Sequence, residues 1–196
     1  MERFAHVVSH DLRNPLSVAQ GRIDMIDDEQ TAVIEKNLDR MEAIITDVLT
    51  LAREGKTVEE TETVALDVVA KQCWAQVETD AAVLSTDDHV RIQADENRCQ
   101  QLLENLIRNS IDHAGEDVAI HVGELSDGFY FEDDGPGIDP DSREQVFEAG
   151  YSTDREGTGF GLNIVHEIAT AHGWSVDITD GSDGGARFEF TGVESA

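Results

Sequence analysis

His10 is the first residue whose type and surroundings indicate chemistry; it lies in the segment SHDLRNPL at positions 9–16. Apolar residues recur around it at three- and four-residue spacing, which predicts a helix with the imidazole off the apolar stripe. Asp11 follows directly, and Asn14 lies one turn along on roughly the same face. Pro15 lacks an N–H and crowds the carbonyl four residues back, so the helix should bend there. The pattern is compatible with a reactive imidazole, a weak two-histidine metal site with the histidine four residues earlier, or an ordinary surface histidine.

A second polar group lies on a long predicted helix over residues 95–113. Asn105, Asn109 and Asp112 fall at positions i, i+4 and i+7, so they share one face, while leucines and isoleucines cover the opposite side. Amide and carboxylate oxygens suit Mg²⁺, which uses few protein ligands and keeps several waters. The pattern therefore predicts a magnesium site on this face, with an ordinary solvated helix surface as the alternative.

Residues 133–137 read DDGPG directly after a predicted strand. A carboxylate only accepts hydrogen bonds, so Asp133 can recognise an amine donor such as the exocyclic group of adenine. The two glycines permit close approach of the backbone to a ligand. The same five residues also make an ordinary turn.

Residues 157–162 read GTGFGL and enter a predicted helix. Glycines at a helix start leave free N–H groups at the positive end of the helix dipole, which suits phosphate. A dinucleotide-binding fingerprint does not fit, because its third glycine would fall on Leu162 and a loop precedes Gly157. The chain also lacks a GxxxxGK(S/T) loop, which excludes a P-loop kinase.

Three of these segments, together with Phe147, resemble the N, G1, F and G2 boxes of the ATP-binding domain of sensor histidine kinases. In chain order they are the polar helix face at 105–112, DDGPG at 133–137, Phe147, and GTGFGL at 157–162. That domain belongs to a superfamily with the DNA gyrase, chaperone and MutL ATPases. Residues 9–16 resemble the H box of the same kinases, so the resemblance covers nearly the whole chain. It implies a two-component kinase that uses ATP and Mg²⁺ to phosphorylate His10 and then passes the phosphoryl group to an aspartate of a response regulator receiver domain.

The resemblance also implies roles within the H box. His10 would be the phosphorylated residue, and Asp11 the base that helps to activate it. Asn14 matches the polar position that orients a water in relatives with phosphatase activity, so a response-regulator phosphatase activity is implied as well.

For the nucleotide, the resemblance puts Asn109, helped by Asn105, at Mg²⁺ and the phosphates, and Asp133 at the adenine amine. The G1 glycines would shape the base pocket and the G2 glycines would lie at the phosphates. Phe147 would anchor one end of a mobile ATP lid over about residues 148–158. The full expected set of nucleotide-binding residues is Asn105, Arg108, Asn109, Asp112, His113, Asp133, Gly135, Gly137, Ile138, Phe147, Gly157, Thr158, Gly159, Phe160, Gly161 and Leu162.

Some positions depart from the family pattern. Gyrase-like relatives carry a glutamate, the base for water, at the position of Asn105; an asparagine cannot take a proton, so transfer is favoured over hydrolysis. Asp112 stands where many histidine kinases carry a lysine, and it repels phosphates unless Mg²⁺ intervenes. Arg108 or Arg155 would supply the missing positive charge, and His113, which replaces a common aromatic residue, can still stack on a base. Two alternatives stay open: a nucleotide-binding pseudokinase or scaffold without transfer, and a gyrase-type ATPase.

The composition bounds partners and location. Fourteen basic and 42 acidic residues give a net charge of −28, which repels nucleic acid and disfavours it as a partner. The charge is typical of a halophilic, haloarchaeal-like protein, because a high-salt cytoplasm screens self-repulsion. No membrane segment is predicted in this chain, which gives a cytoplasmic location. The helical pattern starts at once, so an upstream sensor region is expected to be absent, and membrane anchoring of the full-length protein through that region is left open.

The expected architecture is α+β, with two domains. Residues 1–56 predict a helical hairpin whose near-heptad stripe suits pairing with a copy as a homodimeric four-helix bundle; the alternative is that both helices pack on the next domain. Residues 57–196 predict an α/β sandwich ATP-binding domain, one sheet covered on one face by helices. Cys73 and Cys99 are expected to be buried reduced thiols. Strands are expected at 62–65, 90–94, 118–125, 128–132, 174–179 and 186–190, and helices at 2–26, after the turn 27–30, and at 66–78, 95–113, 141–147 and 160–172.

Overall fold

The computed structural model describes residues 58, 60–77, 79, 81–115, 117–152 and 159–196. It also describes the single positions 19, 34, 38, 41 and 45, which are helical. The rest of the predicted hairpin over 1–56, including His10, Asp11 and Asn14, lies outside the described residues. Among those described, no helix is both long enough and apolar enough to cross a bilayer.

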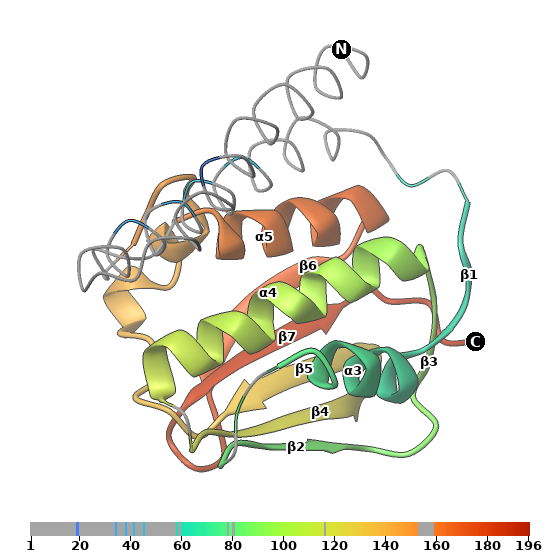
Figure 1. Ribbon diagram of the computed structural model, residues 1–196. Coiled ribbons are helices and arrows are strands. Elements are labelled where there is room, and N and C mark those ends of the chain that lie inside the picture. The colour runs from blue at the N-terminus through green and yellow to red at the C-terminus, as the bar shows by residue number, and fades with distance from the viewer. Residues whose placement is uncertain are drawn as a thin grey trace.

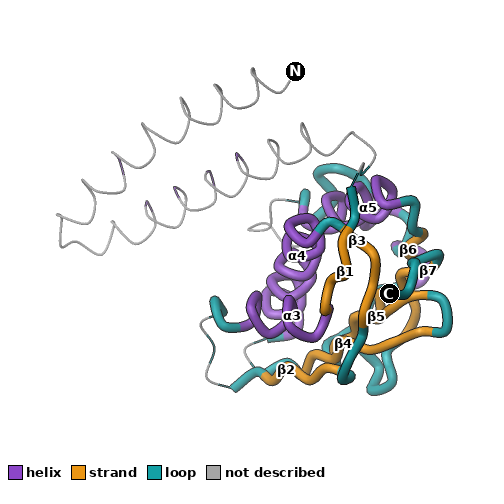
Figure 2. The backbone as a smooth tube through the Cα atoms, turned by 90° about the vertical axis from the view of Figure 1, so that its right-hand side faces the viewer, coloured by secondary structure: helices purple, strands orange, loops and turns teal. Residues whose placement is uncertain are grey.

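The C-terminal part is a layer of three helices on one face of a β-sheet, as the two views in Figure 1 and Figure 2 show. The labels follow Figure 1. In chain order the elements are β1 (Glu62–Ala65), α3 (Leu66–Trp74), β2 (Val83–Thr86), β3 (Arg91–Ala94), α4 (Glu96–Ala114), β4 (Ala119–Leu125), β5 (Gly128–Asp133), the 3₁₀ turns η1 (Pro140–Ser142) and η2 (Gln145–Phe147), α5 (Gly161–His172), β6 (Ser175–Asp180) and β7 (Ala186–Thr191).

The main sheet has five strands in the order β2-β4-β5-β7-β6. The β2–β4 pair is parallel, and the other pairs are antiparallel. A separate small sheet pairs β1 with β3, and the last residues of the chain lie along β3 as well, where Gln93 donates its N–H to the carbonyl of Glu194 at 2.8 Å. Close to this sheet in sequence, Val58 donates its N–H to the carbonyl of Ala171 near the end of α5, at 3.0 Å.

Alternation along the strands determines which face the helices cover. Phe129 and Phe131 of β5 are fully buried, next to Phe190 and Phe188 of β7, with ring centroids 4.6 Å and 6.5 Å apart respectively. Burying one such side chain contributes about 1.5–3 kcal/mol. Tyr130, between the two β5 phenylalanines, is only half-buried and belongs to the uncovered face. The predicted α+β fold, one sheet covered on one face by helices, is confirmed.

The sequence sets the ends of the two site-bearing helices. Asp95 caps α4, because its carboxylate accepts the N–H of Arg98 at 3.1 Å. Gly173 ends α5 with a φ of 78°, a left-handed conformation that glycine adopts readily. Cys73 and Cys99 are buried free thiols, as predicted, and burial raises the pKa of each to about 12.

Three predicted features differ from the structure. Strand β2 is missing from the prediction, because its residues are only exposed or half-buried and VLST carries no clear apolar pattern. The helix predicted over 141–147 is two 3₁₀ turns, since so short a segment seldom stabilises an α-helix; Asp139 caps the first turn by accepting the N–H of Asp141. The helix predicted to end at residue 78 ends at Trp74.

Candidate nucleotide-binding site

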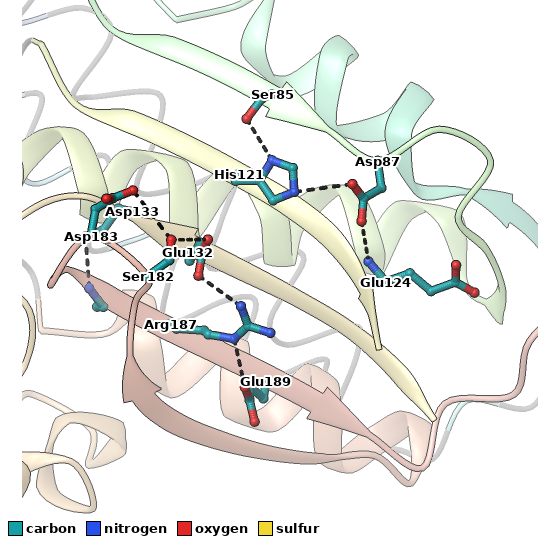
Figure 3. Close-up of polar contacts among 11 residues, drawn as sticks. Ser85, Asp87, His121, Glu124, Glu132, Asp133, Ser182, Asp183, Arg187 and Glu189 are labelled. Carbon is teal, nitrogen blue, oxygen red and sulfur yellow. Dashed lines mark hydrogen bonds and ion pairs between the residues drawn. The ribbon is translucent and has the colours of Figure 1, made fainter. Parts of the chain in front are cut away.

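Asp133 is the most firmly oriented side chain of the candidate site. It ends β5, and its Oδ1 accepts the backbone N–H groups of Gly135 at 3.0 Å and Ala186 at 3.1 Å. Its Oδ2 accepts the hydroxyl of Ser110, on α4, at 2.9 Å. Figure 3 shows Asp133 at the same end of the sheet as Ser182 of the β6–β7 turn. Donors from three parts of the chain therefore hold one carboxylate in a fixed orientation, as selective recognition of an amine requires.

Ser110 and the β6–β7 turn are parts of this site that the sequence analysis did not find. Ser110 is 3% exposed and lies on the apolar side of α4, where a buried hydroxyl needs a partner; that position was the available signal. Gly185, in the turn, lies directly against the strand end, because a Cβ there would be 1.9 Å from the carbonyl oxygen of Asp133. Consecutive glycines between two strands were the signal for this close approach.

The two glycines of the DDGPG segment make room for neighbouring parts of the chain. A Cβ on Gly135 would lie 2.4 Å from the Cβ of Ala114, at the end of α4. Gly137 has a φ of 73°, and a Cβ there would lie 3.0 Å from the carbonyl oxygen of Gly184. The loop after β5 therefore runs close to both α4 and the β6–β7 turn.

Asn105 lies where α4 meets the N-terminal end of α5. Its side chain is 4% exposed, and its Nδ2 donates to the carbonyl of Gln101 at 2.8 Å. Its Oδ1 accepts from the Arg108 guanidinium at 2.7 Å, and a Cβ on Gly161 would lie 3.4 Å from the same oxygen. A solvated helix surface is therefore the wrong description at Asn105. An amide oxygen suits Mg²⁺, but a cation at this oxygen would have to displace Arg108.

Exposure rises along the asparagine face of α4. Asn105 is buried, Asn109 is half-buried, and Asp112 and His113 are exposed near the C-terminal end of the helix. The face thus runs from the interior to the solvent. Solvent and salt screen an exposed carboxylate, so the repulsion expected between Asp112 and phosphates is weakened.

Gly150 and Gly159, at the two ends of the predicted lid, are in direct contact. Gly150 donates its N–H to the carbonyl of Gly159 at 2.9 Å, and a Cβ on Gly159 would lie 2.7 Å from the carbonyl carbon of Gly150. Phe147, at the end of η2, packs against the core, and its carbonyl accepts from Nδ2 of Asn163 on α5 at 2.8 Å. Both ends of the predicted lid are therefore attached near the start of α5.

The other predicted residues fall into two groups. Ile138, Phe160 and Leu162 are half-buried apolar residues that pack against the core. Gly157 and Thr158 lie outside the described residues. The structure thus brings the predicted residues together at two places: Asp133, Gly135 and Gly137 between α4 and the β6–β7 turn, and Asn105, Gly159 and Gly161 where α4 meets the start of α5.

The uncovered face of the sheet carries a charge network next to this site. Figure 3 shows Arg187 between Glu132 and Glu189, with N···O distances of 3.0 Å and 2.7 Å. The guanidinium also lies 3.5 Å from the ring centroid of Tyr130. Burial raises the pKa of Glu132, but hydrogen bonds from Arg187 and Ser182 outweigh burial and hold that pKa below its usual range. Arg187 is therefore a structural residue whose charge is paired with Glu132 and Glu189.

Two family models match the chain. Residues 94–193 match the histidine kinase-, DNA gyrase B- and HSP90-like ATPase family, and residues 1–57 match the His Kinase A (phospho-acceptor) domain. The first match covers just over half of the chain and includes α4, the predicted lid and the whole main sheet except β2.

Known proteins give the same result. The chain is 32% identical to the methanogenesis regulatory histidine kinase FilI of Methanothrix harundinacea, over 97% of this chain and 24% of that protein. It is 31% identical to the sensor protein RstB of Escherichia coli, over 94% of this chain and 47% of that protein. The crystal structure of full-length ShkA in complex with AMPPNP matches all of this chain and 47% of that one, with a TM-score of 0.73 and 27% identity. The chain therefore spans from a quarter to about half the length of these relatives.

Proposed function

Because this chain belongs to the sensor histidine kinases of two-component systems, we propose that residues 57–196 bind Mg·ATP and transfer its γ-phosphoryl group to His10. The observation that carries the proposal is the Asp133 carboxylate, which three donors orient in a site bounded by glycines. A carboxylate held in this way can accept a hydrogen bond from the adenine amine. The similar ShkA structure holds AMPPNP, which supports a nucleotide as the ligand.

The phosphate side of the site lies at α4 and the start of α5. Asn109, which is half-buried, would hold Mg²⁺, which neutralises charge on the phosphates when bound. Asn105 would help only with Arg108 displaced from its amide oxygen. The glycine-rich start of α5 supplies backbone N–H groups at the positive end of a helix of twelve residues. Asn105 has an amide where water attack would need a base, so this site favours transfer to a positioned nucleophile over hydrolysis.

The acceptor side of the reaction belongs to residues 1–56. There His10 would attack the γ-phosphorus in line as a neutral imidazole, Asp11 would help to activate it, and Asn14 would serve a phosphatase reaction on the regulator. Ile34 and Met41, seven residues apart, are 46% and 53% exposed, which supports burial of this helix face in a homodimer. The phosphoryl group would then pass to an aspartate of a response regulator receiver domain in the cytoplasm.

Labelling with γ-labelled ATP tests the proposal. We expect acid-labile label on the wild-type chain in buffer with concentrated KCl, none on His10→Gln, and transfer to a cognate receiver domain. Nucleotide binding without phosphohistidine would instead identify a pseudokinase. Steady phosphate release that persists in His10→Gln would identify a gyrase-type ATPase.

A further inference from the structure

His172 joins the two helices that carry the phosphate side of the site. It is the last residue of α5, and its Nε2 lies 3.0 Å from the backbone nitrogen of Asp95, the residue that caps α4. Its Nδ1 lies 2.8 Å from the carbonyl oxygen of Ile168. A carbonyl only accepts, so Nδ1 donates, and an amide N–H only donates, so Nε2 accepts. Both bonds form together only when the imidazole is neutral.

The imidazole is held in place by the core. Its ring stacks on Trp174 with centroids 4.2 Å apart, and Trp174 in turn contacts Phe129 edge-on at 5.8 Å. Burial lowers the pKa of His172, which keeps the ring neutral near pH 7. The charged groups that act on it are Arg98 and Asp95, both on or at the start of α4, and they have opposite signs.

Besides the side chains that both helices pack into the core, two contacts mark where α4 and α5 meet, and the first is the hydrogen bond between His172 and Asp95. The other is at Asn105, whose Oδ1 would lie 3.4 Å from a Cβ on Gly161. The contacts join the start of α4 to the end of α5 and the middle of α4 to the start of α5, so the helices are antiparallel. At 1.5 Å per residue, the two points are about 15–17 Å apart along each helix. A slip of one helix at one point must therefore appear at the other.

We infer that His172 is a positioning residue for the nucleotide site: its bond to the Asp95 N–H sets the register of α4 against α5. That register decides where Asn105 and Asn109 lie relative to the glycine-rich start of α5. The inference rests on the proposed function, because it assigns these two helix segments to the phosphates of ATP.

Two substitutions separate this bond from the rest of the histidine. In His172→Gln the amide oxygen can take the place of Nε2 and accept the Asp95 N–H. In His172→Asn the shorter amide can take the place of Nδ1 and donate to Ile168, but it leaves the Asp95 N–H without its partner. Both variants lose the ring stacked on Trp174, and only His172→Asn also loses the hydrogen bond to Asp95, so thermal unfolding should show both less stable than the wild type and His172→Asn the less stable of the two.

Titration with a fluorescent ATP analogue is the test. We expect His172→Gln to bind within about twofold of the wild type and His172→Asn to bind roughly three- to tenfold more weakly, the upper limit being the full free energy of the internal hydrogen bond that holds the register. Equal affinities in the two variants would overturn the inference and leave His172 a packing residue only. Absence of binding by the wild type would overturn the proposed function itself, and the inference with it.

A pH series supplies a second measurement that does not depend on the asparagine variant. Protonation of His172 removes the acceptor at Nε2, so wild-type affinity should fall as the pH drops through the lowered pKa of His172, which lies below the ordinary histidine value of 6.5. The His172→Gln variant should fall less, because it reports only the titration of the nucleotide and of other groups. Parallel profiles for the two proteins would contradict the positioning role.

Discussion

Replacing Asp133 with asparagine is the sharpest test of base recognition in this site. The amide oxygen can still accept from the N–H groups of Gly135 and Ala186, and the Ser110 hydroxyl can rotate to accept from the new amide nitrogen. The local structure should therefore persist, at a cost of about 1 kcal/mol in the free energy of unfolding. The adenine amine, however, loses an ionised acceptor and can meet a second donor in its place.

A hydrogen bond to a charged group contributes about 1.5–3 kcal/mol, so Asp133→Asn should raise the Kd for ATP roughly 10- to 150-fold. Calorimetric titration with ATP measures this change, and Asp134→Asn is the matched control. Asp134 is exposed and its carboxylate accepts the N–H of Ala119 at 2.7 Å, so the control makes the same charge change one residue away. Unchanged affinity in Asp133→Asn, or an equal loss in Asp134→Asn, would refute the assignment of Asp133 to the base.

Three further predictions follow from the contacts described. Gly185→Ala should cost about 3 kcal/mol in unfolding free energy and weaken ATP binding, because its Cβ would lie 1.9 Å from the Asp133 carbonyl oxygen. Gly184→Ala meets no atom within 4 Å but has a φ of 96°, so it should cost only backbone strain and weaken binding less than Gly185→Ala. The hydrogen bonds that lower the pKa of Glu132 stabilise the fold at pH values above 4.5, the ordinary pKa of the group, and this stabilisation is lost as the pH falls through the lowered pKa. Denaturant unfolding of Glu132→Gln should therefore lack that part of the pH dependence. Cys73 and Cys99, with pKa values near 12, should react with a thiol reagent only at the rate of unfolding.

The parts of the fold with strong local patterns could be predicted from the sequence. The period of α4 and the apolar patterns of β5 and β7 predicted these elements to within a residue or so. Strand β2 could not be predicted, because its place depends on parallel pairing with β4 rather than on a pattern of its own. The turns η1 and η2 lie where a helical pattern competes with Pro140 and the capping Asp139.

The candidate site likewise contains residues that could be predicted from the sequence and residues that could not. Asp133 and the two clusters of glycines could be named, since each lies in a short motif. Ser110 and Gly185 could not, because their role is to contact a residue 23 or 52 positions away, and only the folded chain brings them together. His172 looked like an ordinary helix end, and its partner Asp95 is 77 positions away.

The hydrogen bond between Gly150 and Gly159 bears on how far the length of the predicted lid can vary. The entropy of bringing the ends of a loop together depends on the number of residues between them, and here the folded domain fixes both ends independently of ligand. Each doubling of the intervening length would cost only about 0.6 kcal/mol. Insertions between these two glycines should therefore leave the melting temperature of the domain nearly constant.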